Sequence, residues 1–242
     1  MPDRFTYRSA EKELLDEPNI PCGLLFKNLR ELDILNRTTG GHTISIKGIK
    51  KLITDHQKLY RVVDLGCGSG DSLRAIADWA RVNNYRVHLT GVDWNAQTIA
   101  YLKIHCKNYP EISGIHADYK EYLKENVLID IVHCSLFCHH LTDDELICLF
   151  SYLGHYVKTG FIINDLQRHW LPYYAAWFFT RLLNGTKLAK NDGPVSVLRG
   201  FKSGELMDLL ACAEIKFFSI QQEFAFRFLI VGKSGKHKPI AG

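Results

Sequence analysis

Long apolar runs are absent from this chain of 242 residues. No segment reaches the roughly 18 consecutive apolar residues that a membrane-spanning helix needs, and no signal peptide is evident. We therefore expect a cytoplasmic protein whose only membrane contact would be peripheral. The seven cysteines follow no regular spacing, so we expect reduced thiols rather than a disulfide framework.

A concentrated charge of either sign is also missing. The net charge is only +4, and Lys and Arg are scattered apart from a short basic tail at Lys233, Lys236 and Lys238. Nucleic-acid-binding proteins usually show a clustered basic face, so nucleic acid is not an expected partner. The length fits one domain with a small helical cap. We place the cap at residues 1–56 and the main domain at residues 57–242.

The glycine-rich run VVDLGCGSGD, which ends at Asp71, lacks the marks of two common nucleotide sites. A Walker loop needs Gly-Lys-Ser/Thr, which is absent. A dinucleotide fingerprint has its third glycine where this chain has Asp71. The glycines present are Gly66, Gly68 and Gly70, and Asp64 stands just before them. Two carboxylates would repel a pyrophosphate but attract a cofactor with an ammonium and a sulfonium group.

Two further strands are expected to end in an acid, at Asp93 and Asp118. Asp93 follows the glycines by about 20 residues, where a carboxylate can bind ribose hydroxyls. Asp118 could accept a hydrogen bond from an adenine amino group. Because parallel strands end at the same sheet edge, these acids and Asp64 predict a site for a phosphate-free adenosine cofactor.

Strand-like and helix-like segments alternate over the middle of the chain. Strands are expected near residues 61–65, 87–92, 112–116, 129–134 and 160–164. This alternation predicts an α/β fold, with a parallel sheet and helices on both faces. Thr142 and Glu145 have the spacing of a capping box at a helix start. Later elements are expected as a helix at 203–213 and strands at 215–221 and 224–231.

On these motifs the chain resembles the class I S-adenosylmethionine-dependent methyltransferases, over about residues 60–165. The resemblance implies a Rossmann-like, doubly wound sheet of seven strands, mostly parallel with an antiparallel last strand. It implies that Asp64 and the glycines hold the methionine part of S-adenosylmethionine, Asp93 the ribose and Asp118 the adenine. The further cofactor contacts that we assign are Cys67, Trp94, Tyr119 and Ser135.

Four shorter motifs are similar to a bacterial subgroup whose members often stand beside polyketide or quinone biosynthesis functions. They are residues 15–18 (LDEP), 29–32 (LREL), 164–169 (NDLQRH) and 192–194 (DGP).

The N-terminal region has a helical pattern over residues 9–36, which Pro18 and Pro21 interrupt. Gly40 then breaks the pattern, and a shorter helix is expected near residues 45–55. We expect these elements to cap the cofactor cleft. The alternative is that they only cover one edge of the sheet.

The insertion at residues 166–200, after the fifth strand, is rich in aromatic side chains. We interpret it as a lid that forms an apolar acceptor pocket over the sheet edge where ligands bind. An ordinary pair of core helices and a surface that dips into a membrane are the alternatives. The candidate acceptor-binding residues are Asp165, Arg168, His169, Trp170, Tyr173 and Tyr174. The first three could instead form structural ion pairs.

Adjacent histidines follow the fourth strand, where the resembled family faces the transferable methyl. A phenol, with a pKa near 10, benefits from a base, and histidine suits that role. His139 and His140 are therefore the candidate catalytic bases, of which we expect only one to face inward; both could instead be structural. With Cys134, Cys138 and Cys148 they could suggest a metal, but the spacing is not that of a zinc site, so we expect none.

The sequence thus predicts a methyltransferase that uses S-adenosylmethionine on a small-molecule acceptor. We expect O-methylation of an aromatic, polyketide-like or quinone-like molecule, with C- or N-methylation of a lipid or other metabolite as the alternative. Asp71 disfavours a dehydrogenase. A non-catalytic binding protein is the alternative of another class, and the retained acids Asp64, Asp93 and Asp118 argue against it. The oligomeric state is left open.

Overall fold

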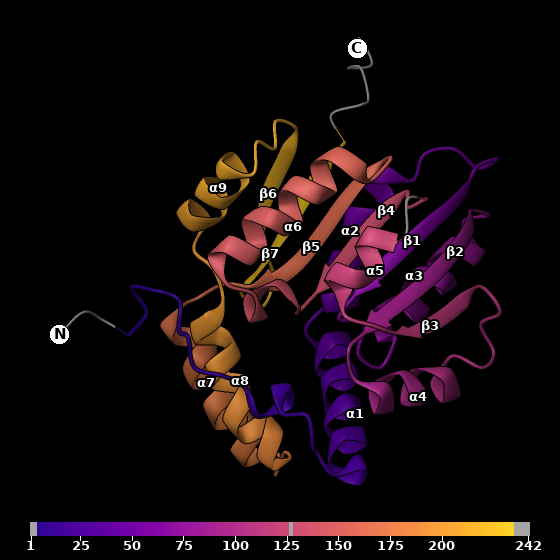
Figure 1. Cartoon of the computed structure of the whole chain (residues 1–242). Coiled ribbons are helices and arrows are strands. Elements are labelled where there is room, and N and C mark those ends of the chain that lie inside the picture. Colours follow the sequence, from indigo (N-terminus) through magenta and orange to yellow (C-terminus); the bar gives the residue numbers. More distant parts are fainter. Residues whose placement is uncertain (1–3, 126–127, 235–242) are drawn as a thin grey trace.

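The computed structural model describes residues 4–125 and 128–234. Its seven strands form one sheet in the order β3-β2-β1-β4-β5-β7-β6 (Figure 1). Strands β1 to β5 are parallel, and β7 runs antiparallel to its neighbours β5 and β6. The bounds are β1 Leu59–Leu65, β2 Arg86–Asp93, β3 Ile112–His116, β4 Ile131–Ser135, β5 Gly160–Leu166, β6 Phe218–Glu223 and β7 Arg227–Lys233. The predicted Rossmann-like sheet with an antiparallel last strand is confirmed.

Helices cover both faces of this sheet. Their bounds are α1 Cys22–Thr38, α2 Gly41–Leu52, α3 Asp71–Val82, α4 Ala96–His105, α5 Tyr119–Glu125, α6 Asp143–Tyr156, α7 Trp170–Leu182, α8 Lys187–Arg199 and α9 Ser203–Cys212, with short 3₁₀ helices η1 Leu14–Asp16 and η2 Cys138–His140. Helices α2, α3 and α4 share one buried cluster with the sheet, which includes Ile49 and Ile76. Helices α5, α6 and α9 share the cluster of the other face, which includes Phe150 and Leu206. The doubly wound arrangement therefore has one core on each face.

Local signals in the sequence explain several helix starts. The Thr142 side chain accepts a hydrogen bond from the backbone N–H of Glu145, and the Glu145 carboxylate accepts one from the backbone N–H of Thr142. This is the predicted capping box, at the start of α6. Asn95 caps α4 in the simpler way, because its side-chain oxygen accepts from two backbone N–H groups of the first turn.

The N-terminal region is less helical than predicted. Only η1 precedes α1, and α1 begins directly after Pro21. Residues 4–21, which we call the N-terminal strap, instead satisfy backbone donors against α8. The N–H of Ser9 donates to the carbonyl of Leu198 at 3.0 Å, and the N–H groups of η1 donate to the Asp192 carboxylate. Of the helical pattern expected over residues 9–36, the part before Pro21 is therefore wrong apart from η1, because long-range partners replace helical ones.

The insertion after β5 forms the helical hairpin α7–α8, which lies with α1 beyond the carboxyl ends of the parallel strands (Figure 1). Helix α8 packs against α7 and α1 and buries Leu188 and Val195. Helix α7 buries none of its side chains. The alternative of an ordinary core helix pair is therefore wrong for α7.

No helix in the described ranges is long and apolar enough to cross a membrane. The cytoplasmic location and the division at residue 56 stay predictions. Of the basic tail, Lys233 ends β7, while Lys236 and Lys238 lie outside the described residues.

Candidate functional site

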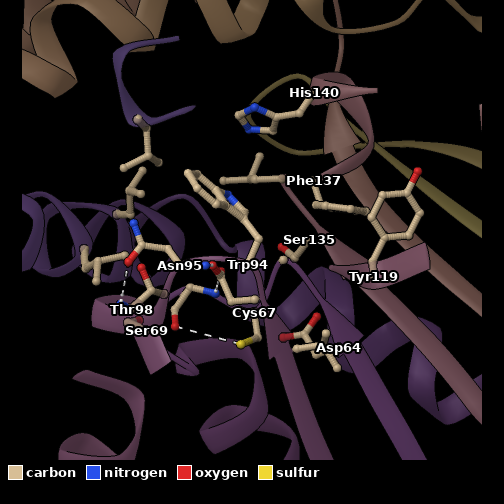
Figure 2. Close-up of a pocket in the computed structure, with 18 of the residues that line it drawn as sticks. Asp64, Cys67, Ser69, Trp94, Asn95, Thr98, Tyr119, Ser135, Phe137 and His140 are labelled. Atoms are coloured by element: carbon tan, nitrogen blue, oxygen red, sulfur yellow. Dashed lines mark hydrogen bonds between the residues drawn. The ribbon is translucent and has the colours of Figure 1, made fainter. Parts of the chain in front are cut away.

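A cavity of about 360 Å³ opens at the carboxyl ends of β1, β2 and β4, under α1 and the N-terminal strap. Figure 2 shows His140 at one end of it and Asp64 with Cys67 at the other, with Trp94 and Ser135 between them. Of the ten predicted cofactor residues, nine line this cavity. They are Asp64, Gly66, Cys67, Gly68, Asp93, Trp94, Asp118, Tyr119 and Ser135. Gly70 is not among the lining residues and instead precedes α3 as its N-cap.

The backbone conformation of the glycine loop requires glycine at three positions. Gly66, Gly68 and Gly70 have φ angles of 65°, 51° and 68°, in the left-handed region that side chains disfavour. A Cβ on Gly66 would also stand 2.3 Å from the Phe137 ring. The loop is held to the next strand because the N–H groups of Gly66 and Cys67 both donate to the Val92 carbonyl.

The three predicted acids meet at the cavity wall, each with a different environment. Asp64 accepts a hydrogen bond from Nδ1 of His133 at 2.7 Å, and burial raises the pKa of Asp64. Burial also raises the pKa of Asp93 to about 6, although this carboxylate accepts backbone N–H groups of Asn95 and the glycine loop. Asp118 accepts from a backbone N–H at 2.7 Å. Asp93 and Asp118 thus bind backbone N–H groups beside the cavity, whereas Asp64 is paired with His133 of β4.

Asp71, at the position where a dinucleotide site has glycine, anchors α1 and α2 to the loop. Its carboxylate accepts hydrogen bonds from the side chains of Asn36 and His42, both at 2.8 Å, and from Ser69. Burial opposes ionisation of Asp71, but these hydrogen bonds lower its pKa to about 2. Asn36 and His42 were not predicted, and no local motif marks them.

The cavity wall is rich in negative charge. Its carboxylates are Asp16, Asp64, Asp71, Asp93, Asp118 and Glu145. Lys120 also lines it, but its ammonium is paired with Glu145 at 2.7 Å. Such a wall favours a ligand with positive charge over a phosphate-bearing one.

Of the two predicted histidines, only His140 lines the cavity. His139 is buried, and its Nδ1 lies 2.7 Å from Oδ1 of Asp165. Burial would lower the pKa of His139, but the charges of Asp165 and Glu13 and the hydrogen bond to Asp165 raise it to about 10. The expectation that one neighbour faces inward therefore matches this geometry. A protonated, buried ring with such a pKa is unsuited to act as a free base near neutral pH.

The N-terminal strap adds two acids that sequence reasoning missed. Oε1 of Glu13 lies 3.4 Å from Nε2 of His139, and Oε2 lies 3.9 Å from Nε2 of His140. Asp16 lines the cavity, and its Oδ1 is 3.1 Å from Nδ1 of His140 without hydrogen-bond alignment. Arg199 fixes this arrangement, because it donates to the carbonyls of both histidines and of the strap.

None of the predicted acceptor-binding residues lines the cavity, and the lid interpretation stays a prediction. Their side chains serve other partners. Arg168 is buried, pairs with Glu205 and donates to backbone carbonyls of the strap. His169 accepts from a backbone N–H as the N-cap of α7.

The aromatic residues of the same set lie on α7, away from the cavity. Trp170 and Tyr174 are about half exposed, at 54% and 53%, and the Arg4 guanidinium stands 4.4 Å from the centre of the Tyr173 ring. Asp165, the remaining member, is bound to His139.

Comparisons with known proteins agree with this geometry. Residues 62–160 match a family model described as a methyltransferase domain. No curated protein matches the chain by sequence. The solved structures show the fold at low identity, and the chain covers only 57% of the first one described below.

Three solved structures illustrate the likeness. Human N-acetylserotonin methyltransferase, in complex with S-adenosylmethionine, is 14% identical with a TM-score of 0.63 over 89% of this chain. The plantazolicin methyltransferase BpumL, in complex with S-adenosylhomocysteine, is 16% identical with a TM-score of 0.62, over 91% of this chain and 83% of its own. The pyocyanin biosynthetic protein PhzM is 16% identical with a TM-score of 0.54, over 80% of this chain and 55% of its own. Residues 62–160 are therefore similar to a methyltransferase domain, and the chain shares its fold with proteins solved in complex with S-adenosylmethionine or S-adenosylhomocysteine.

Proposed function

We propose that this protein transfers the methyl group of S-adenosylmethionine to a hydroxyl of an aromatic, polyketide-like or quinone-like small molecule. The observation that carries the proposal is the single cavity in which the glycine loop, three strand-end acids and His140 meet. Two proteins of the same fold hold S-adenosylmethionine or S-adenosylhomocysteine.

The cavity fits the charge and shape of this cofactor. Asp64 and the glycine loop are proposed to hold the ammonium end, because they combine a carboxylate with bare backbone. Asp93 is proposed to accept the ribose hydroxyls and Asp118 the adenine amine. Trp94 and Tyr119 line the wall beside these acids and are proposed to contact the adenine ring. The ionised wall around the site matches a cofactor that carries two positive centres and no phosphate.

The acceptor end is proposed to lie between His140 and the leucines of α1. Leu25, Leu29 and Leu32 line the cavity there, together with Leu15 of the strap. These side chains support the interpretation that the N-terminal elements cap the site. Since Lys120 is paired with Glu145, the described wall offers no unpaired lysine or arginine for an acidic acceptor. A mostly apolar acceptor with a neutral hydroxyl fits best.

The reaction requires little of the protein beyond positioning the two reactants. S-adenosylmethionine supplies a methyl on a sulfonium, which is a good leaving group. The walls hold the acceptor oxygen in line with that methyl, and such alignment accounts for much of the rate in reactions of this kind. His140 and Asp16 are the polar side chains at the acceptor end, and we propose that they act where the hydroxyl loses its proton.

Two measurements test the proposal. S-adenosylhomocysteine should raise the melting temperature and NAD should not, because a ligand that binds only the folded state stabilises it. Labelled methyl transfer to a panel of phenols, quinols, amines and carboxylic acids should show turnover with the phenols or quinols. Turnover only with amines or at carbon would replace O-methylation by the C- or N-methylation alternative. A thermal shift without any turnover would favour the non-catalytic binding protein.

A further inference from the structure

Three buried polar atoms without a hydrogen-bond partner converge beside the acceptor end of the cavity. They are Oε1 of Glu13, Nε2 of His139 and Nδ1 of His140. The side chains of Glu13 and His139 are only 3% and 2% exposed. An unsatisfied buried polar atom costs about 1–3 kcal/mol, so three of them in one place point to a ligand-binding site.

We propose that Glu13, His139 and His140 bind one divalent metal ion, for which zinc is the best fit. Each offers a ligand atom, and these atoms all lie within 4.8 Å of one another. Two imidazoles and one carboxylate are a ligand set that zinc accepts in catalytic sites, where a further position stays open.

The distances separate metal ligands from hydrogen-bonded partners. His139 Nε2 and Glu13 Oε1 are 3.4 Å apart, beyond the roughly 2.7–3.2 Å of an N–H···O hydrogen bond. Tetrahedral ligands at about 2.0–2.1 Å from zinc stand about 3.3 Å from one another. The observed spacing fits two ligands on one ion.

Asp165 orients the His139 ring for metal binding. Its two oxygens face Nδ1 and the backbone N–H of His139, at 2.7 and 3.2 Å. A bound ion displaces the proton on Nε2. Asp165 holds the remaining proton on Nδ1, so the lone pair of Nε2 faces Glu13. Metal-binding histidines almost always have such a carboxylate or carbonyl behind them.

Charge also favours a bound cation. The carboxylates of Glu13, Asp16 and Asp165 surround the two rings. The guanidinium of Arg199 lies 4.0 Å from Oε1 of Glu13, and the buried guanidinium of Arg227 acts on Asp165. Arg8 pairs with Asp143. The three carboxylates outnumber the two guanidiniums that act on them, which favours a bound cation.

The two rings are placed to share one ion. The centroids of His139 and His140 are 4.2 Å apart, and Oε2 of Glu13 lies 3.9 Å from Nε2 of His140. One ion between them can therefore bind Glu13 and both rings.

The ion would deepen the proposed function, on which this part of the inference rests. His140 lines the cavity, so an ion on it borders the acceptor. A bound divalent ion acts as a Lewis acid and lowers the pKa of a hydroxyl that it binds. Both histidines are then ligands rather than free bases, and the proton of the hydroxyl passes to Asp16, which also lines the cavity. The sequence disfavoured a metal because the cysteines lack zinc spacing, and the strap supplies Glu13 in their place.

Metal binding by the full chain is the direct test. After chelator treatment, titration calorimetry with Zn²⁺ should show one site per chain, and elemental analysis should find about one ion. The isosteric variant Glu13→Gln should weaken zinc binding at least 100-fold, and Asp165→Asn by about 10–100-fold. His155→Ala is the matched control, since His155 is an exposed histidine on α6, and it should bind zinc as the parent does. Equal affinity in Glu13→Gln, or no zinc site at all, would overturn the proposal.

Cobalt spectroscopy on the unmodified protein keeps the test independent of how the variants fold. Co²⁺ on nitrogen and oxygen ligands should show ligand-field bands without thiolate charge transfer. A thiolate band would place the ion on Cys134 or Cys138 and overturn the assignment. Chelation should reduce methyl transfer at least 100-fold without changing the thermal shift by S-adenosylhomocysteine. If the metal binds but that shift is absent, the proposed function fails while the metal site stands.

Discussion

Oδ2 of Asp93, at the end of β2, accepts a hydrogen bond from the backbone N–H of Gly68 at 3.2 Å. The same carboxylate accepts the N–H of Asn95 at 2.9 Å through Oδ1. It therefore shapes the glycine loop and the start of α4 as well as lining the cavity. Its pKa of about 6, raised by burial, places a change of charge close to neutral pH.

Binding of S-adenosylhomocysteine should weaken as the pH falls through 6. The ribose hydroxyls are proposed to donate to the ionised carboxylate of Asp93, which predominates above pH 6 and becomes protonated below it. Between pH 7 and pH 5 the dissociation constant should rise up to about tenfold, as expected one unit below the pKa. Calorimetric titrations at a series of pH values measure this.

Asp93→Asn is the control for that profile. It should lower the affinity about 10–100-fold, because hydrogen bonds to a charged group are worth about 1.5–3 kcal/mol. It should also flatten the dependence between pH 5 and 7. A variant that keeps the parental pH dependence would assign the titration to another group.

Gly66→Ala should abolish cofactor binding or reduce it more than 100-fold. The new methyl group would stand 2.3 Å from the Phe137 ring on a backbone with φ of 65°, so both loops must move. Gly23→Ala is the matched control, because Gly23 lies in α1 with nothing within 4 Å of an added Cβ. In a helix that change should add up to about 1 kcal/mol of stability. Equal thermal shifts by S-adenosylhomocysteine in both variants would show that the loop tolerates a side chain.

His140→Ala should lower the turnover number about 100-fold. Electrostatic stabilisation of a reacting oxygen lowers the activation barrier by several kcal/mol, and each 1.4 kcal/mol of that barrier is about tenfold in rate. His139→Ala should lower it as well, and should also destabilise the fold, because it leaves the buried carboxylate of Asp165 unpaired at a cost of about 3–5 kcal/mol. Both variants should keep the parental affinity for S-adenosylhomocysteine. Full activity in both variants would show that neither histidine takes part in the reaction.

Arg199→Met should reduce the free energy of unfolding by about 3 kcal/mol, since it leaves buried carbonyls unsatisfied at about 1–3 kcal/mol each. The guanidinium donates to the carbonyls of His139, His140 and Glu11 at 3.1, 2.7 and 2.6 Å. Arg37→Met is the control on an exposed pair with Asp33 and should change stability by less than about 1 kcal/mol. Urea unfolding followed by circular dichroism compares the two, and equal losses would contradict the role given to Arg199.

The sheet and the acid-lined cavity could be predicted because their signals are local. Strand periodicity and the acid after each strand lie within one segment, and parallel pairing then brings Asp64, Asp93 and Asp118 to one edge. Glu13 could not be predicted in this way. It reaches His139 only because the strap gives up helical hydrogen bonds for partners on α8, and no spacing in the sequence encodes that exchange.

The direction of side chains limited the prediction for the insertion. Its composition is apolar whether α7 faces the cavity or the solvent, and the structure turns its aromatic side chains outward. The candidate residues Arg168 and Asp165 point into the protein instead, because buried carbonyls and His139 need them as partners.

Substitutions on α7 should therefore leave the cavity unaffected. Trp177 and Phe178 are 45% and 52% exposed, and neither lines the cavity. Replacing both with Ser should change the free energy of unfolding by less than about 1 kcal/mol, as for surface positions, and should leave KM for a water-soluble phenol unchanged. Leu198→Ala, on the buried side of α8, is the control and should cost about 2–5 kcal/mol. A rise in KM for the α7 variant at unchanged stability would show that this helix contributes to the acceptor site, as the sequence predicts.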